Sequence, residues 1–103
     1  MGATLKMLID GALVDGDSTM EVINPATAKP FASVACASVA QADAAIAAAK
    51  KAQPGWAAVP FEERAEYLRK LASAIDARAD ELARTLVQEQ GKPLPEAQAE
   101  IAY

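Results

Sequence analysis

Two neighbouring stretches decide the fold of this chain: SVAQADAAIAAAKKAQPGW (Ser38–Trp56) and PFEERAEYLRKLASAIDARADELARTLVQEQGKP (Pro60–Pro93). In both stretches apolar residues recur every three or four positions, which is the period of a helix that buries one face. We therefore predict helices in both stretches. Residues before Ser38 lack this period and instead form short apolar runs between turn-forming residues.

The first helix is predicted to begin at Ser38, because Ser38 and Gln41 have the spacing of a capping box. We predict that Pro54-Gly55 ends it, since proline removes a helical hydrogen bond and glycine is a weak helix former. Lys50 and Lys51 would then lie in its last turn, where positive charge favours the helix dipole.

The second helix is predicted to begin near Pro60 with an apolar stripe on one side. Uninterrupted to Gln90, it would be about 45 Å long, so we predict a break between Asp76 and Asp80, with Asp80 capping the second part. The stripe comprises Phe61, Ala65, Leu68, Ala72, Ile75, Ala79, Leu82 and Leu86.

The end of the chain carries a further helix signal. Gly91 is predicted to stop the preceding helix, and Pro93 or Pro95 to open another that includes Ile101. The sequence ends at Tyr103, a few residues into this pattern. We therefore expect the chain to be a piece of a larger protein.

Residues 1–37 are predicted to form a short N-terminal β-meander, followed by two to four α-helices in residues 38–103. Asp10-Gly11 is a strong hairpin signal, and Asn24-Pro25 is typical of a turn. The predicted strands are Lys6–Ile9, Ala12–Val14, Met20–Ile23 and Pro30–Cys36.

Composition predicts a thin core. Apolar residues make up 52% of the 103 residues, but 26 of them are alanine and only 5% of the chain is aromatic. Burying a methyl group removes little apolar surface from water, at roughly 25 cal/mol per Å². Alanine-rich helix faces of this kind suit close docking onto another part of a protein.

The charge pattern excludes several classes of partner. Ten basic and fourteen acidic residues give a net charge of −4, with no basic stripe, so neither nucleic acid nor an anionic membrane surface is an expected partner. A single cysteine permits no disulfide within the chain, and the first residues lack the apolar run of a signal peptide. We therefore expect a cytoplasmic location.

No catalytic constellation accompanies these elements. Histidine, the commonest general base, is absent from the chain. Cys36 is the one thiol, but no base is available to activate it. We interpret Cys36 as a buried strand residue and predict no catalytic or cofactor-binding residue in this chain.

Several short sequence segments occur in a fixed order from about residue 8 to the end of the chain. They are Ile9-Asp10-Gly11, Asn24-Pro25-Ala26-Thr27, the run Asp43–Ala52 with Pro54 and Trp56, then Arg64, Leu68 and Leu71, and finally Glu89-Gln90-Gly91-Lys92-Pro93 with Glu96 and Glu100. No segment is diagnostic alone, but the ordered set resembles the N-terminal region of the aldehyde dehydrogenase superfamily.

The resemblance implies an α/β parent enzyme with the aldehyde dehydrogenase fold, which oxidises an aldehyde to a carboxylic acid with NAD or NADP. Its catalytic groups and most of its cofactor site would lie beyond this chain. Residues 38–103 would pack on the absent cofactor-binding domain. The implied partners are the rest of the polypeptide and further copies of it, as a dimer or tetramer.

The resemblance also implies a monovalent cation site, often occupied by sodium in the family. The matching positions are the backbone carbonyls of Val22 and Ile23 and the carboxylate of Glu100. Oxygen ligands of this kind suit a hard cation.

A second reading from the residues alone is not enzymatic. The Phe61–Leu86 stripe would let a standalone helical interaction module associate with a second copy of itself, as a coiled coil does.

Overall fold

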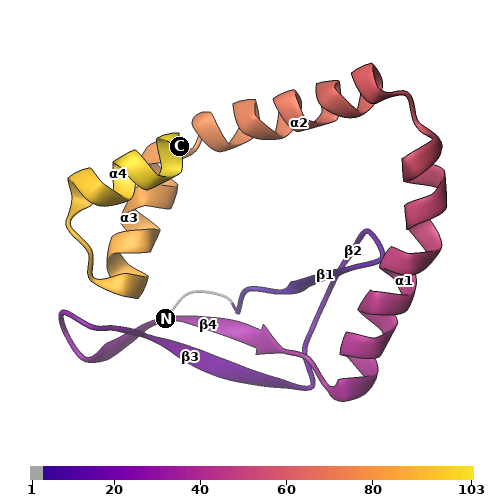
Figure 1. Ribbon diagram of the computed structural model, residues 1–103. Coiled ribbons are helices and arrows are strands. Elements are labelled where there is room, and N and C mark those ends of the chain that lie inside the picture. The colour runs from indigo at the N-terminus through magenta and orange to yellow at the C-terminus, as the bar shows by residue number, and fades with distance from the viewer. Residues whose placement is uncertain (1–3) are drawn as a thin grey trace. The chain divides into compact units, whose positions relative to one another are not determined.

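The computed structural model describes residues 4–103, in which four strands precede four helices (Figure 1). This order confirms the predicted fold class. The chain divides into two compact units, one with residues up to Val22 and Pro30–Val59, the other with Ile23–Lys29 and Pro60–Tyr103. The division into residues 1–37 and 38–103 stays a prediction. The elements are β1 (Met7–Ile9), β2 (Ala12–Val14), β3 (Ser18–Asn24), β4 (Lys29–Cys36), α1 (Val39–Ala58), α2 (Phe61–Asp76), α3 (Ala79–Gln90) and α4 (Leu94–Ala102).

The strands pair two by two, β1 with β2 and β3 with β4. In the first pair, Met7 lies opposite Val14 in an antiparallel ladder. Asp10 and Gly11 have φ of 50° and 76°, as a two-residue hairpin turn requires, so the hairpin predicted at this dipeptide is confirmed. A parallel bridge between Leu5 and Val34 connects the residue stretch before β1 to β4.

Cys36 is the last residue of β4, so its predicted place in a strand is confirmed. Its side chain is half-buried rather than fully buried. The carbonyl oxygen of Cys36 accepts a hydrogen bond of 3.0 Å from the amide of Asp17. This bond holds the bend between β2 and β3 against the end of β4.

The capping box at the start of α1 is present as predicted. The amide of Gln41 donates to Ser38 Oγ at 3.2 Å, and the amide of Ser38 donates to Gln41 Oε1 at 3.0 Å. Gln41 Nε2 also donates to the carbonyl of Asp15 at 3.0 Å, which ties α1 to the β2–β3 bend. Local residue order therefore sets the start of α1, whereas a bond between residues 26 positions apart attaches it to the strands.

The predicted end of α1 at Pro54-Gly55 is wrong, because the helix runs through both residues to Ala58. The φ that proline imposes is helical, so Pro54 removes one hydrogen bond without turning the chain out. The residue that leaves the helix is Val59, with ψ of 135°, since a residue before proline is pushed towards extended conformations. Lys50 and Lys51 consequently lie inside the helix and not in its last turn.

Gly55 offers a direct test of this helix extension. Its backbone is helical and a Cβ added there would meet no atom within 4 Å. A Gly55→Ala variant is expected to stabilise the chain by about 0.5–1 kcal/mol, because alanine loses less backbone entropy in a helix. Thermal unfolding followed by circular dichroism at 222 nm measures this. The reverse change, Ala57→Gly, should lower stability by a similar amount, and a loss in Gly55→Ala would contradict the helical assignment.

The break predicted between Asp76 and Asp80 is confirmed, since α2 ends at Asp76 and α3 begins at Ala79. The Phe61–Leu86 stripe is therefore divided between two helices. Asp80 as the cap is wrong, because Arg78 holds the cap position without a side-chain bond. Asp80 accepts from Arg84 Nε at 2.9 Å instead, one helical turn further on.

Arg78 also pairs with an acidic side chain in the first turn of α3. Its Nε donates to Glu81 Oε2 at 2.9 Å. This hydrogen bond, with the charge attraction beside it, lowers the pKa of the Glu81 carboxyl and raises the pKa of Arg78. Both side chains are exposed, so the pair orders the turn more than it stabilises the helix.

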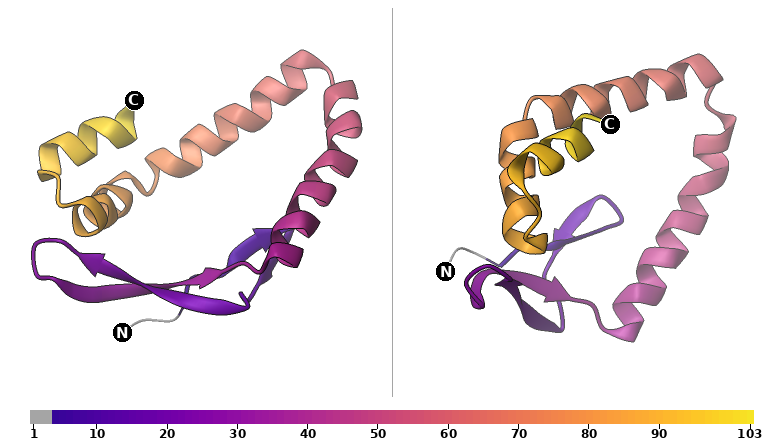
Figure 2. Two further views of the ribbon diagram at one scale, coloured as in Figure 1. Left: turned by 60° about the horizontal axis from the view of Figure 1, so that its bottom comes forward. Right: turned by 60° about the vertical axis from the view of Figure 1, so that its left-hand side comes forward.

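The core of the second compact unit, which comprises Ile23–Lys29 and Pro60–Tyr103, lies between α3 and α4. These two helices pack side by side (Figures 1 and 2). Ala83 on α3 and Ala97 on α4 are both fully buried. Among residues 4–103 no large side chain is fully enclosed. The thin core predicted from the alanine content is therefore confirmed for these residues.

Candidate functional site

Two of the segments singled out from the sequence, the Asn24-Pro25 turn and the Gly91-Lys92 loop, meet within one compact unit, where the β3–β4 turn approaches the α3–α4 junction. Asn24 organises the turn: its Oδ1 accepts from the amide of Ala26 at 2.9 Å, and its carbonyl accepts from the amide of Ala28 at 2.8 Å. Ala28 has φ of 54°, which closes the turn tightly. This geometry is the usual one for asparagine beginning a turn.

Gly91 ends α3 in the left-handed conformation, with φ of 75°, and its amide donates to the carbonyl of Val87 at 2.8 Å. The predicted stop at Gly91 is thus confirmed. A Cβ at this position would lie 2.9 Å from Cγ of Pro25. The Asn-Pro turn and the Gly-Lys-Pro loop, 66 positions apart in sequence, therefore touch within one compact unit.

Replacing Gly91 with alanine tests this contact. We expect a loss of about 1–2 kcal/mol, from the left-handed backbone and from the displaced Pro25 ring. Gly91→Asn is the matched control, because asparagine tolerates this backbone but still carries a Cβ. Urea unfolding should find both variants less stable than the parent chain and the alanine variant the weaker; an unchanged Gly91→Asn would show that the proline contact has no energetic weight.

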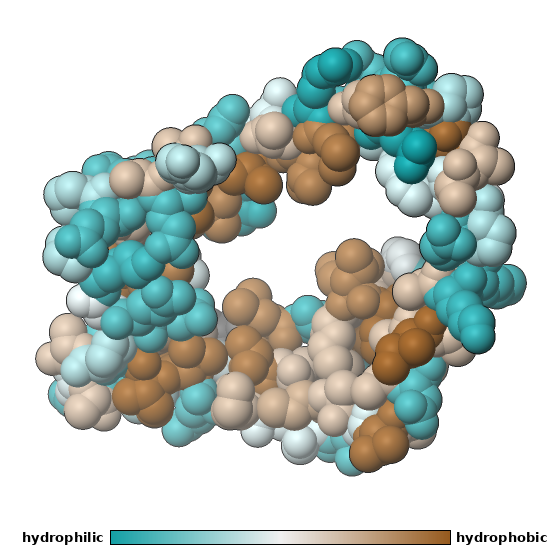
Figure 3. Space-filling model, in the orientation of Figure 1, coloured by the Kyte–Doolittle hydropathy of each residue, from teal (hydrophilic) through white to brown (hydrophobic). Residues whose placement is uncertain are grey.

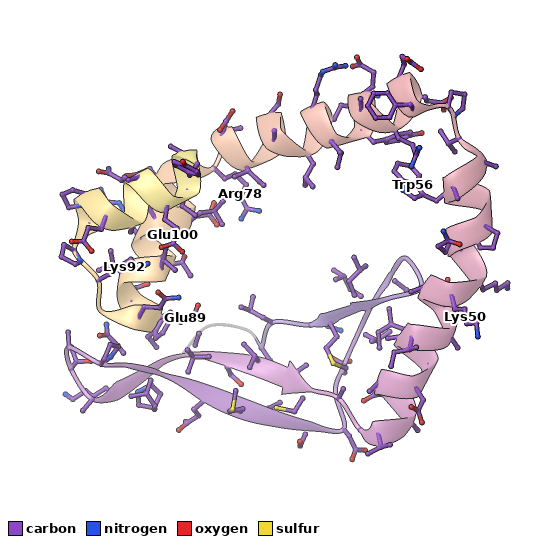
Figure 4. The ribbon with its side chains drawn as sticks, viewed as in Figure 1. Lys50, Trp56, Arg78, Glu89, Lys92 and Glu100 are labelled. Carbon is purple, nitrogen blue, oxygen red and sulfur yellow. The ribbon has the colours of Figure 1, made fainter. Side chains whose placement is uncertain are left out.

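Lys92 follows Gly91 and forms an ion pair with Glu100, which lies one helix further along the chain in α4 (Figure 4). The lysine side chain is three-quarters covered, whereas the glutamate is half exposed. The pair closes the α3–α4 loop against the last turns of α4. Sequence reasoning missed this pair, and the only signal for it was opposite charge across a short loop.

The three residues of the predicted cation site are not gathered within one unit. Val22 and Ile23 are neighbours near the end of β3, and Glu100 lies in α4. Val22 belongs to one compact unit, whereas Ile23 and Glu100 belong to the other. The donor set, one carboxylate and two backbone carbonyls, has the chemistry that a hard cation prefers.

Two further features of the described residues concern metal sites and membrane spans. No cluster of three or more histidine, cysteine, aspartate or glutamate side chains placed to hold a metal ion occurs in residues 4–103. No helix in that range combines the length and apolar character needed to cross a lipid bilayer. The contacts of Pro25 with Gly91 and of Lys92 with Glu100 join a turn, a loop and helix α4.

Comparison with known proteins identifies the family. The model of the aldehyde dehydrogenase family matches residues 13–103. Glutarate-semialdehyde dehydrogenase of Pseudomonas aeruginosa is 46% identical over 97 residues, which cover 92% of this chain and 20% of that protein. The chain thus spans about a fifth of the length of the curated relatives that it matches.

Solved structures agree in fold as well as in sequence. A NAD-dependent benzaldehyde dehydrogenase from Corynebacterium glutamicum is 38% identical, with a TM-score of 0.87 over 93% of this chain and 22% of that one. An NADP-dependent enzyme from Escherichia coli is also 38% identical, with a TM-score of 0.92 over 97% of this chain and 21% of that one. With sequence and fold in agreement over nearly all of its residues, the chain belongs to the aldehyde dehydrogenase family.

Proposed function

We propose that this chain is the N-terminal scaffold of an enzyme that oxidises an aldehyde to a carboxylic acid with NAD or NADP. The observation that carries the proposal is the family match over residues 13–103, which corresponds to about a fifth of each relative's length. One relative is described as NAD-dependent and another as NADP-dependent, so the choice of cofactor stays open within the proposal.

The proposed enzyme carries its reactive groups outside these residues. In that reaction a thiolate would add to the aldehyde carbon, bound NAD or NADP would supply the hydride acceptor, and water would release the acid. This chain offers no histidine, and its one thiol, Cys36, lies at a strand end with the bend at Asp17 hydrogen-bonded to its backbone. Its part is to position neighbouring polypeptide, and we propose no catalytic or cofactor-binding residue within it.

The test is a graft in which this chain replaces the matching segment of the Pseudomonas aeruginosa relative. We expect the graft to form NADH or NADPH with a panel of aldehydes, and the isolated 103-residue chain to form none above background. The relative with its segment deleted is the control. Turnover by the isolated chain, or a folded graft without turnover, would refute the proposed function.

We include a cytoplasmic location and a dimer or tetramer in the same proposal. Sedimentation of the graft gives its oligomeric state directly. For the alternative, a standalone module that self-associates through the Phe61–Leu86 stripe, the comparisons offer no support. The stripe is also interrupted at Ala77 and Arg78, where α2 ends.

We include in the proposal a sodium ion held by the carbonyls of Val22 and Ile23 and by Glu100, with further ligands from outside the chain. In favour of it, the Glu100 carboxylate is half exposed and already attracts the ammonium of Lys92. Lys92 would compete with the ion. We therefore expect Glu100→Gln to abolish, and Lys92→Met to enlarge, any sodium-dependent stabilisation of the graft.

The measurement compares melting temperatures in sodium chloride and in N-methylglucamine chloride at equal ionic strength, so that charge screening cancels. A graft with the same melting temperature in both salts would contradict the cation site while leaving the dehydrogenase proposal intact.

A further inference from the structure

The chain contains two aspartate-glycine pairs, Asp10-Gly11 and Asp15-Gly16. In such a pair the glycine nitrogen attacks the aspartate carboxyl carbon, because glycine has no side chain to obstruct the approach. A C–N bond forms, and the amide hydrogen and the carboxyl hydroxyl leave together as water, which gives a succinimide ring. Water then opens this ring at one of its two carbonyl carbons. The product is either aspartate again or isoaspartate, whose backbone runs through the side-chain carbon.

The backbone around each pair controls ring closure. Closing the ring rotates the aspartate about its Cα–C bond, so the surrounding turn has to open first. Segments differ widely in the free energy of such local opening, which is low where few contacts hold the backbone. Because both pairs consist of the same two residue types, the structure and not the sequence decides which of them reacts.

Asp10-Gly11 forms the turn of a short and weakly held hairpin. Three cross-strand pairs connect β1 with β2, and a hairpin of this size is marginally stable by itself. Leu8 and Leu13 are 70% and 69% exposed, and hydrophobic groups lie at the surface of the hairpin (Figure 3). Asp10 is exposed too, and a Cβ added at Gly11 would meet no atom within 4 Å.

Helix α1 does not close over this turn. Asp10 and Gly11 border a groove of about 310 Å³ between the hairpin and α1. The helix side of the groove consists of small side chains, namely Ala45, Ala48, Ala49 and Ala52. The turn can therefore open into this space without displacing packed side chains.

Asp15-Gly16 is fixed by neighbours on several sides. The carbonyl of Asp15 accepts from Gln41 Nε2 at 3.0 Å, and its carboxylate accepts from Lys6 Nζ at 3.2 Å. A Cβ at Gly16 would lie 2.4 Å from the carbonyl oxygen of Cys36, so this bend lies directly against β4. Opening it breaks contacts with both α1 and β4.

We propose that Asp10-Gly11 is a site of isoaspartate formation, and that the fold protects Asp15-Gly16 from the same reaction. Isoaspartate adds one carbon to the backbone of a two-residue turn, so the β1–β2 ladder loses the register that this turn sets. Both pairs and their contacts lie in the first compact unit, within residues up to Val22 and Pro30–Val59. The inference is therefore independent of the proposed function.

The test incubates the graft in heavy-oxygen water and follows both pairs over time. Ring opening places one heavy oxygen in the reacted residue. Electron-transfer fragmentation of the peptides then separates Asp10 from Asp15, and isoaspartate from aspartate. The same graft in urea gives the rate of each pair without the fold.

We expect similar rates at the two pairs in urea. In buffer, isoaspartate should form at Asp10 at least about tenfold faster than at Asp15, because only the first turn opens readily. Equal rates in buffer, or a faster reaction at Asp15, would overturn the proposal. Turnover by the graft has no part in this readout.

Two variants separate the chemistry from the protection. Asp10→Glu lengthens the side chain beyond the spacing of a succinimide, so it should abolish the product at this turn; a product that persists would refute the assignment. Gln41→Ala removes the bond to the Asp15 carbonyl and should raise the rate at Asp15 about fivefold, with Asp10 unchanged. An unchanged rate at Asp15 would overturn the protective role of this contact.

Discussion

A Gly16→Ala variant is expected to lose about 3 kcal/mol of stability, more than alanine at any other glycine in residues 4–103. Gly16 lies in the bend between β2 and β3, and a Cβ there would lie 2.4 Å from the carbonyl oxygen of Cys36 and 2.6 Å from its amide nitrogen. Both are backbone atoms and cannot swing aside as a side chain can. The bend must therefore move away from β4.

Moving the bend also weakens the bonds that depend on it. The amide of Asp17 would leave the Cys36 carbonyl, and the carbonyl of Asp15 would leave Gln41 Nε2. Deuterium exchange at β4 and at the first turn of α1 should therefore rise together in this variant. Chemical denaturation gives the total loss of stability.

Gly11→Ala is the matched control for this prediction. Gly11 has φ of 76°, but a Cβ there would meet nothing within 4 Å. Its replacement should cost only the backbone strain of about 1 kcal/mol. Equal losses in the two variants would mean that crowding at Gly16 is relieved without cost.

The second large effect is expected from Ala97→Asp, which places a carboxylate in the fully buried contact between α3 and α4. We expect a loss of about 4 kcal/mol, because the charge leaves water without a partner on α3. The result should be separation of α4 from α3. Amide exchange in both helices and the far-ultraviolet circular dichroism signal would report it.

Ala99→Asp introduces the same charge two residues along, at an exposed position of the same helix. Helix propensity and the unfavourable dipole term near a C-terminus together account for less than about 1 kcal/mol there. The difference between the two variants therefore isolates burial. Similar stabilities would show that α3 and α4 are not packed through Ala97.

Turns and helix ends that depend on residues close together in the sequence could be predicted from it. The Asp10-Gly11 turn, the Ser38–Gln41 capping box and the stop at Gly91 each depend on side chains within a few positions of one another. The end of α1 was predicted at the wrong proline. Pro54 is compatible with a helical φ and only removes one hydrogen bond, whereas Pro60 forces the preceding residue, Val59, out of the helix. The local sequence does not show which of these two effects is stronger.

The candidate site was less predictable because its contacts are distant in sequence or depend on loop geometry. The approach of Pro25 to Gly91 joins a strand turn to a helix end, and no local pattern encodes it. The ion pair of Lys92 with Glu100 depends on how sharply the chain turns after Gly91. The residues of this junction were named from the family resemblance, but their contacts required the fold.

Two fully buried alanines, one on α3 and one on α4, limit which sequence changes this junction can tolerate. Ala83 and Ala97 are already almost the smallest side chains available, so nearly every replacement adds volume to a packed interior. In a core of large side chains, a larger residue can be accommodated when a neighbouring side chain becomes smaller. Here the fully buried residues are alanines, which have almost no side-chain volume to lose. Drift at these two positions should therefore be confined to glycine and serine, even where the surrounding surface changes freely.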